Sequence, residues 1–139
     1  MSSKLIKNTP ANICFIASHF PQGGAERQIL ELIKGLLKKK YKVTLILYQS
    51  DQIFYEEILE LDINLILNKD KPSKNVFFKW INNILFLRKN LKNNSFDILH
   101  TYLFHNGLIV RLFAAKKHLG KIIYSIRGPY KSKSVSGLY

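Results

Sequence analysis

The chain has 139 residues, 47% of them hydrophobic, and its 22 Lys and Arg against 9 Asp and Glu give a formal net charge of +13. This length fits one domain, and the hydrophobic fraction allows a buried core and excludes a disordered chain, while no apolar run is long enough for a signal peptide or a membrane span. The excess positive charge favours an anionic partner: a nucleic acid, an anionic membrane surface or a phosphorylated small molecule.

Short apolar runs alternate with longer amphipathic segments along the chain. Residues 13–17 form the first apolar run, with polar flanks, and predict a strand covered on both faces. Cys14 fits a small buried core residue in this run, and as the one cysteine it excludes a disulfide framework and suits a reducing cytosol. Residues 25–40 carry apolar side chains at helical spacing and end in three lysines, which suit the negative end of a helix dipole.

The alternation continues to the fifth strand. Further strands are predicted at residues 43–48, 63–67, 97–101 and 121–126, and further helices at residues 52–61, 75–94 and 106–118. Strands separated by helix-length segments form right-handed βαβ units. We therefore predict an α/β fold, a Rossmann-like parallel sheet with helices on both faces, formed by residues 1–139 as a single domain.

The loop after the first strand is the first candidate site, because ligands of open parallel sheets bind at the carboxyl ends of the strands. Gly23 and Gly24 stand there, before Glu26 and Arg27. Two glycines let the backbone approach a ligand closely, and the free N–H groups of a helix start would stabilise a diphosphate or a sugar oxygen. The alternative is a flexible turn in which Gly24 only caps the helix. The spacing is not that of a dinucleotide-binding loop, so nothing supports an NAD or FAD site.

Histidines supply the second set of candidates. His105 stands where the fourth strand gives way to a helix, and there a neutral imidazole can donate a hydrogen bond to a sugar hydroxyl; a purely structural role is an equal alternative. His100 is nearer the strand interior, where packing is favoured. His19 could line the same crevice, and His118, beside two lysines, is expected in solvent.

Arg127 follows the fifth strand and is the third candidate. An arginine that leaves a parallel strand points into the crevice and suits a carboxylate or a phosphate. The alternative is a solvated arginine before the turn formed by Gly128 and Pro129.

Taken in order, three stretches resemble the N-terminal domain of glycosyltransferase family 4, the retaining enzymes with the GT-B fold. They are residues 19–27, 96–105 and 121–128, and the resemblance extends over about residues 12–130. Its most specific part is the run Gly-Gly-Ala-Glu-Arg at residues 23–27. Some relatives carry a histidine where this chain has Tyr102.

The resemblance implies a hexosyltransferase-type enzyme that moves a sugar from a nucleotide-sugar donor to a glycan or lipid-linked acceptor, with retention at the anomeric carbon. The acceptor would bind mainly to this domain, as in cell-envelope polysaccharide or glycolipid assembly. His105 would be the catalytic residue, touching the donor sugar or orienting the acceptor. The substrate-binding residues would be Gly23, Gly24, Glu26, Arg27, Tyr102 and Arg127. No cofactor and no metal are expected, and no residue cluster has metal-ligand spacing.

The family's second Rossmann domain is not found in these 139 residues. We therefore expect an incomplete N-terminal domain that is inactive alone and needs another chain to supply the C-terminal domain. The alternative is a non-catalytic, truncated remnant. Such a remnant would expose apolar sheet surface and would fold poorly or not at all.

The predicted helix at residues 75–94 suggests a membrane partner. Its apolar stripe consists of Phe77, Trp80, Ile81, Ile84, Leu87 and Leu91. Phe78 and Phe86 fall off this stripe, among lysines, and a basic face with exposed aromatic rings suits an anionic leaflet. The alternative is a solvated lysine-rich face whose aromatic rings are covered by missing segments. We expect a cytoplasmic protein, peripheral at the inner face of the membrane. A basic nucleic-acid-binding domain is a more distant alternative, which rests on charge alone because no nucleic-acid-binding signature is present.

Overall fold

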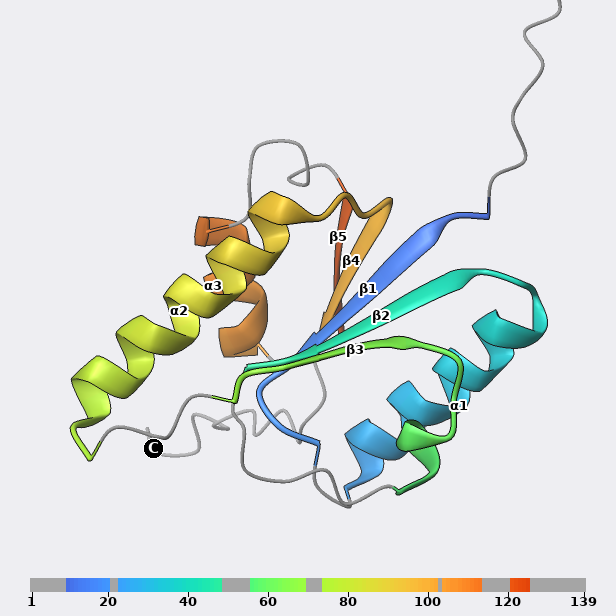
Figure 1. The fold of residues 1–139 in the computed structure, drawn as a ribbon, viewed down its shortest axis with the longest axis horizontal. Coiled ribbons are helices and arrows are strands. Elements are labelled where there is room, and N and C mark those ends of the chain that lie inside the picture. The colour runs from blue at the N-terminus through green and yellow to red at the C-terminus, as the bar shows by residue number, and fades with distance from the viewer. Residues whose placement is uncertain are drawn as a thin grey trace, which may run out of the picture.

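The computed structural model describes residues 10–20, 23–48, 56–69, 74–102, 104–113 and 121–125. Within these residues one parallel sheet has the strand order β3-β2-β1-β4-β5 (Figure 1). The strands are β1 (Asn12–Ala17), β2 (Lys42–Leu47), β3 (Asn64–Leu67), β4 (Ile98–Tyr102) and β5 (Ile122–Ser125). The predicted α/β, Rossmann-like class is confirmed.

Strand β1 is the centre of the sheet, and it pairs with β2 on one side and β4 on the other. Phe15 lies opposite Leu45 and His100. Alternate residues of β1 face two separate apolar clusters, so both faces of the strand are covered, as its continuous apolar sequence predicts. Cys14 is fully buried, which confirms its predicted place in the core. Burial also raises the pKa of its thiol well above the usual value.

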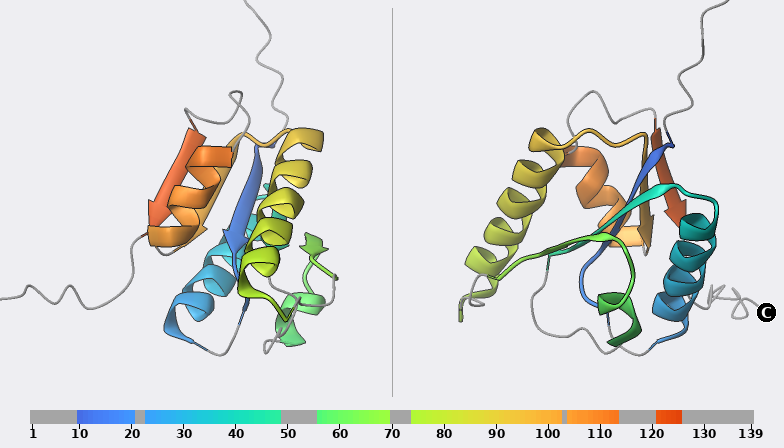
Figure 2. Two further views of the ribbon diagram at one scale, coloured as in Figure 1. Left: turned by 90° about the vertical axis from the view of Figure 1, so that its left-hand side faces the viewer. Right: turned by 45° about the vertical axis from the view of Figure 1, so that its right-hand side comes forward.

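Helices cover the sheet on both faces, as the right-hand view of Figure 2 shows. Helix α1 (Gly24–Lys38) and the 3-10 helix η1 (Glu56–Leu59) pack on the first face, where Ile29, Leu30 and Ile33 are buried. Helix α2 (Val76–Asn93) and helix α3 (Phe104–Phe113) lie on the second face.

The ends of the two long helices follow local sequence signals. Asn75 caps α2, because its side chain accepts a hydrogen bond of 2.9 Å from the Phe77 N–H. Helix α1 ends in a Schellman motif, in which the N–H groups of Lys40 and Tyr41 donate to the carbonyls of Leu37 and Leu36. Lys40 occupies the left-handed position of this motif with a φ of 61°.

Two predicted helices differ from the structure. Of the helix expected at residues 52–61, the described part, from residue 56, contains the 3-10 turn η1, and residues 52–55 lie outside the described residues. The helix expected at residues 106–118 begins earlier, at Phe104, and its described part ends at Phe113.

The apolar stripe predicted for α2 is correct only in the later part of the helix. Asn83, Ile84, Leu87 and Leu91 are its buried residues, whereas Phe77 and Trp80 are 64% and 51% exposed. The first turns of α2 reach beyond the carboxyl edge of the sheet (Figure 1), so no sheet surface lies beneath them. The helical period is right, but the sheet is shorter than the helix.

Candidate functional site

The carboxyl ends of the strands bring polar residues from separate loops to one edge of the sheet. Ser18 and His19 follow β1, Tyr48 follows β2 and Asn68 follows β3. Because the strands are parallel, these residues lie at the same edge of the sheet, the carboxyl edge, which is where open α/β sheets bind their ligands.

Gly23 is the N-cap of α1. Its backbone is extended, it has no side chain to cap the helix, and its carbonyl accepts a 3.0 Å hydrogen bond from the Arg27 N–H. A Cβ at Gly23 would meet the Glu26 carboxylate, whereas a Cβ at Gly24 would meet nothing within 4 Å. The cap is therefore Gly23 rather than Gly24. The Glu26 side chain is folded back over Gly23, so its negative charge lies beside the positive end of the helix dipole.

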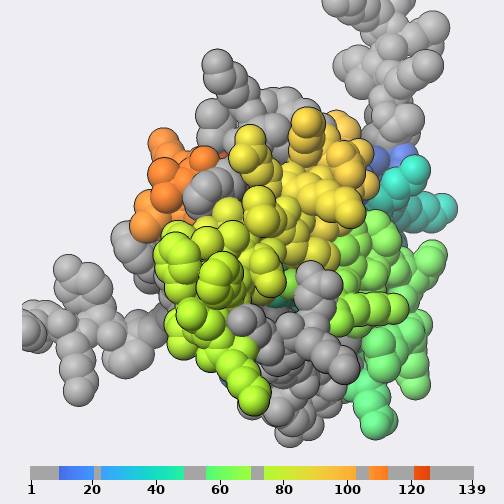
Figure 3. Space-filling view, turned by 60° about the vertical axis from the view of Figure 1, so that its left-hand side comes forward, coloured from blue at the N-terminus to red at the C-terminus, as the bar shows by residue number. Residues whose placement is uncertain are grey.

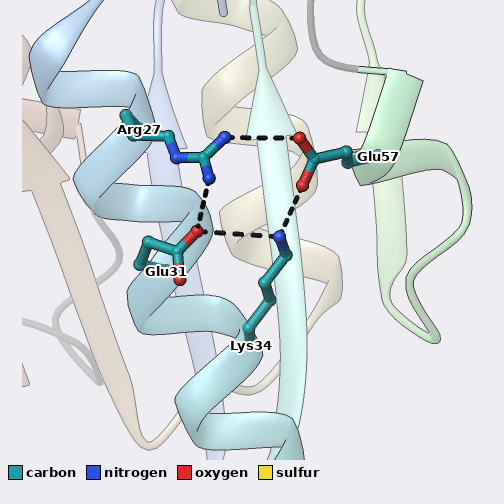
Figure 4. A network of polar contacts seen from close by, with 4 residues as sticks. All are labelled: Arg27, Glu31, Lys34 and Glu57. Carbon is teal, nitrogen blue, oxygen red and sulfur yellow. Dashed lines mark hydrogen bonds and ion pairs between the residues drawn. The ribbon is translucent and has the colours of Figure 1, made fainter.

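Arg27 takes part in an ion-pair network that joins α1 to η1 (Figure 4). Its guanidinium lies 3.2 Å from Glu31 and 3.3 Å from Glu57. Lys34 bridges the same two carboxylates, at 3.6 Å and 2.5 Å. The hydrogen bond between Lys34 and Glu57 is the main cause that lowers the pKa of Glu57 and raises the pKa of Lys34. The network directs the Arg27 guanidinium toward η1.

His100 and Tyr102 form a stack on β4. Their ring centroids are 4.7 Å apart, and the ring of Phe15, which is paired with His100 across the sheet, lies 5.2 Å from the ring of His100. His100 Nε2 lies 2.8 Å from the Ser125 hydroxyl, which ties β4 to β5. His100 thus has the packing role that its position in the strand predicts. Tyr102 is 4% exposed and belongs to the core on the α1 face.

The backbone of His105 lies in the first turn of α3, directly after β4, where the sequence places it. Its side chain lies outside the described part of the structure, as do Arg127 and His118.

A cavity of about 310 Å³ opens at this edge, on the α2 face of the sheet. Ser18, His19 and Tyr48 line it from the strand ends, and Trp80 and Asn83 line it from α2. Ile84 and Leu87 of α2 and Ile109 of α3 supply apolar wall. Burial raises the pKa of Tyr48 to about 12, so its hydroxyl is neutral at physiological pH.

Among the residues of this cavity, the sequence predicted only His19 as a crevice residue, whereas Trp80, Ile84 and Leu87 were expected in the apolar stripe of the helix. The sequence signal that could have indicated Asn83 is its place on the predicted inner face of a helix, where an amide is unusual among leucines and isoleucines. A larger hollow, of about 810 Å³ near Pro10, Lys40 and Asn64, lies at the amino edge of the sheet and away from the strand ends that bind ligands.

A model of glycosyltransferase family 4 matches residues 22–138. The match takes in α1 and every later helix and strand that the structure describes. The chain belongs to glycosyltransferase family 4. No curated protein matches it.

Membership of family 4 gives the chain a glycosyltransferase role, with a sugar donor and an acceptor as its general partners. In the described ranges of this family-4 domain, no group of three or more His, Cys, Asp or Glu could hold a metal ion. Nor does any helix of the described part have the length and apolar character needed to cross a bilayer. The expectation that transfer needs no metal stays a prediction.

Proposed function

We propose that the chain is the acceptor-side domain of a retaining glycosyltransferase, which moves a sugar from a nucleotide-sugar to a glycan or lipid-linked acceptor. The observation that carries the proposal is the Gly23–Gly24 loop, at the start of α1 on the carboxyl edge of a parallel sheet, in a family-4 chain. There the donor diphosphate and sugar would meet the positive end of a helix dipole.

The residue roles follow the same proposal. His105 is the catalytic residue and touches the donor sugar or orients the acceptor, and Arg127 binds an anionic group of a substrate. Gly23, Gly24 and Glu26 shape the loop against the donor. For Arg27 and Tyr102 the described contacts support a positioning role, because the first is held by Glu31 and Glu57 and the second is buried against His100.

A second Rossmann-like domain completes the enzyme in this proposal, because the donor nucleotide is bound mainly there. The chain alone is then inactive, and no metal takes part: the leaving phosphate acts as the base in same-face attack.

Co-expression with the frame encoded immediately downstream tests the proposal. If that frame supplies a second Rossmann-like domain with paired glutamates, the pair should transfer a labelled sugar from a nucleotide-sugar and retain the anomeric configuration, read by NMR. The variant His105→Ala should abolish transfer. Inversion would refute retention, turnover by the chain alone would refute the need for a second domain, and an inactive pair would refute the transferase.

We also propose that the chain works at the inner face of the cytoplasmic membrane. Between Lys74 and Asn94 there is no acidic residue, and α2 carries Lys79, Arg88, Lys89 and Lys92. The first turns of the same helix expose Val76, Phe77 and Phe78 by 80%, 64% and 57%. Figure 3 shows α2 running across one face of the molecule, beside α3. Exposed aromatic rings next to cationic side chains suit the headgroup region of an anionic leaflet, and this supports a lipid-linked acceptor.

A further inference from the structure

The cavity between α2 and the strand ends contains a buried amide whose NH₂ group has no acceptor among the described residues. Asn83 is 8% exposed and lines this cavity. Its Oδ1 accepts a hydrogen bond of 3.2 Å from Asn68 Nδ2, but within the described residues nothing accepts a hydrogen bond from its own Nδ2. A buried donor left unsatisfied is costly, and native structures seldom keep one without a reason.

The orientation of the Asn83 amide follows from its neighbours. Asn68 Nδ2 also lies 3.1 Å from the Tyr48 carbonyl, which can only accept a hydrogen bond, so this end of Asn68 must be the NH₂ group. The atom of Asn83 that faces Asn68 must then be the oxygen. The NH₂ group of Asn83 is the opposite end of the amide, turned away from Asn68.

The rest of the lining indicates the chemistry of the ligand. None of the described lining residues is Lys or Arg, so the described lining offers no fixed positive charge to hold a phosphate. Trp80, half exposed, offers an indole face and an N–H, and Ile84, Leu87 and Ile109 add apolar wall. The Ser18 hydroxyl and His19 Nδ1 are 2.8 Å apart, which leaves Nε2 as the free ring nitrogen of His19 among the described contacts.

From this juxtaposition we propose that the cavity binds one neutral sugar ring, whose apolar C–H face packs on Trp80 while a hydroxyl accepts from the Asn83 amide. The volume of about 310 Å³ is at the lower end of ligand pockets and fits one ring rather than an extended chain. This inference rests on the proposed function, since it makes the bound ring the sugar unit of the acceptor nearest the reaction.

Trp80 is the one tryptophan of the protein and lines this cavity, so its fluorescence can report on binding there. We would titrate the full chain with the methyl glycosides of glucose, galactose and N-acetylglucosamine, and with uridine and inorganic phosphate as competing chemistries. At least one glycoside should give a saturable change, with a Kd on the order of 1 mM. The proposal is overturned if no glycoside saturates, or if uridine or phosphate alone does.

A matched pair of variants tests the amide. Asn83→Asp keeps the acceptor for Asn68 and removes the NH₂ donor, and it should weaken glycoside binding at least tenfold. Asn82→Asp makes the same change at an exposed position of the same helix and should leave binding unchanged. If Asn83→Asp does not fold, Ile109→Phe fills the cavity instead and should block binding. Wild-type affinity in a folded Asn83→Asp or Ile109→Phe protein would overturn the proposal.

The two proposals fail separately. Glycoside binding without transfer, when the second domain is present, would refute the transferase and leave the sugar site. Transfer at the wild-type rate and the wild-type acceptor KM in Asn83→Asp would refute the sugar site and leave the transferase.

Discussion

At the residue scale, the ion-pair network on the α1 face is the feature with the most direct pH dependence. The pKa of Glu57 is lowered in the folded chain, so its contribution to stability is present above its unfolded pKa and is lost as pH falls through the folded value. The pKa of Lys34 is raised, so its contribution is complete below its unfolded pKa and is lost as pH rises through the folded value.

At pH values between about 5 and about 10, the Glu57→Gln variant should therefore have a lower melting temperature than the wild type. In acid, once the wild-type carboxyl is protonated, the two melting temperatures should be equal. Thermal melts followed by circular dichroism at several pH values measure this. Glu60→Gln is the control, because it changes the net charge equally at an exposed carboxylate for which the described residues give no ion pair. An equal loss in both variants would mean that net charge, not the network, is responsible.

At the element scale, α3 approaches β4 and β5 closely enough to require a glycine. A Cβ at Gly107 would meet the ring of Tyr124 and would come within 3.2 Å of the Thr101 hydroxyl. We expect Gly107→Ala to destabilise the protein by about 1–3 kcal/mol, because the ring must move or α3 must shift.

Gly35→Ala is the matched change, since Gly35 is exposed on α1 with nothing within 4 Å of an added Cβ. It should stabilise the protein by about 0.5–1 kcal/mol, because alanine restricts the unfolded chain and favours helix. Urea unfolding of both variants gives the comparison. Stabilisation by Gly107→Ala would show that α3 does not need this close approach.

Helix α2 carries the second prediction at this scale. If its basic, aromatic side docks on an anionic leaflet, Lys89→Glu should weaken binding to vesicles that contain phosphatidylglycerol by about 1 kcal/mol for each unit of charge changed. Phe78→Ser should also weaken it, through the lost apolar contact.

Lys38→Glu, on α1 and the opposite face of the sheet, is the control of equal charge and should bind nearly as well as the wild type. Co-sedimentation with vesicles of phosphatidylcholine, with and without phosphatidylglycerol, measures all four proteins. If Lys38→Glu and Lys89→Glu lose binding equally, net charge attracts the chain to the vesicle and α2 has no special part.

At the scale of the whole molecule, the question is whether the chain folds cooperatively or is the poorly folded remnant that its sequence leaves open. Cys14 is the one thiol and lies in the central strand, paired with Thr44 of β2 and Leu99 of β4. Because the thiolate is the reactive form and burial disfavours it, Cys14 should not react with a thiol reagent in the native protein.

The Cys14 thiol should begin to react only as urea unfolds the chain, and the reaction should follow the same unfolding transition as the circular dichroism signal. Wild-type protein in water is the reference, and fully unfolded protein sets the maximal rate. Rapid reaction without urea, or a gradual change without a transition, would favour the remnant.

Much of this architecture could be predicted from local signals. The five strands lie within a residue of their predicted bounds, α1 and α2 nearly so, and the burial of Cys14 and the packing of His100 follow from their places in apolar runs. The region before β3 could not be predicted as well: in the described part of the segment expected as a helix, the structure has the 3-10 turn η1, whose Glu57 contacts α1 and whose Ile58 packs in the core.

The candidate site could be predicted only in part. The sequence indicated the glycine loop and the place of His105 at the end of β4, because both depend on positions along the chain. It missed the cavity, whose polar contact joins Asn68 and Asn83 across two elements, and it gave no sign that Arg27 would be held by Glu57, 30 residues away.

The sequence by itself thus determined the fold class and the family, because hydrophobic periodicity and short motifs are local properties of the chain. Only the tertiary structure decided which aromatic rings are covered: Tyr102 is buried, while Phe77 and Trp80 are exposed. A period shows which side chains share a face of a helix, but not where the sheet beneath it ends. That limit depends on the packing of all the strands together, and it is what leaves Trp80 at the cavity beside the strand ends.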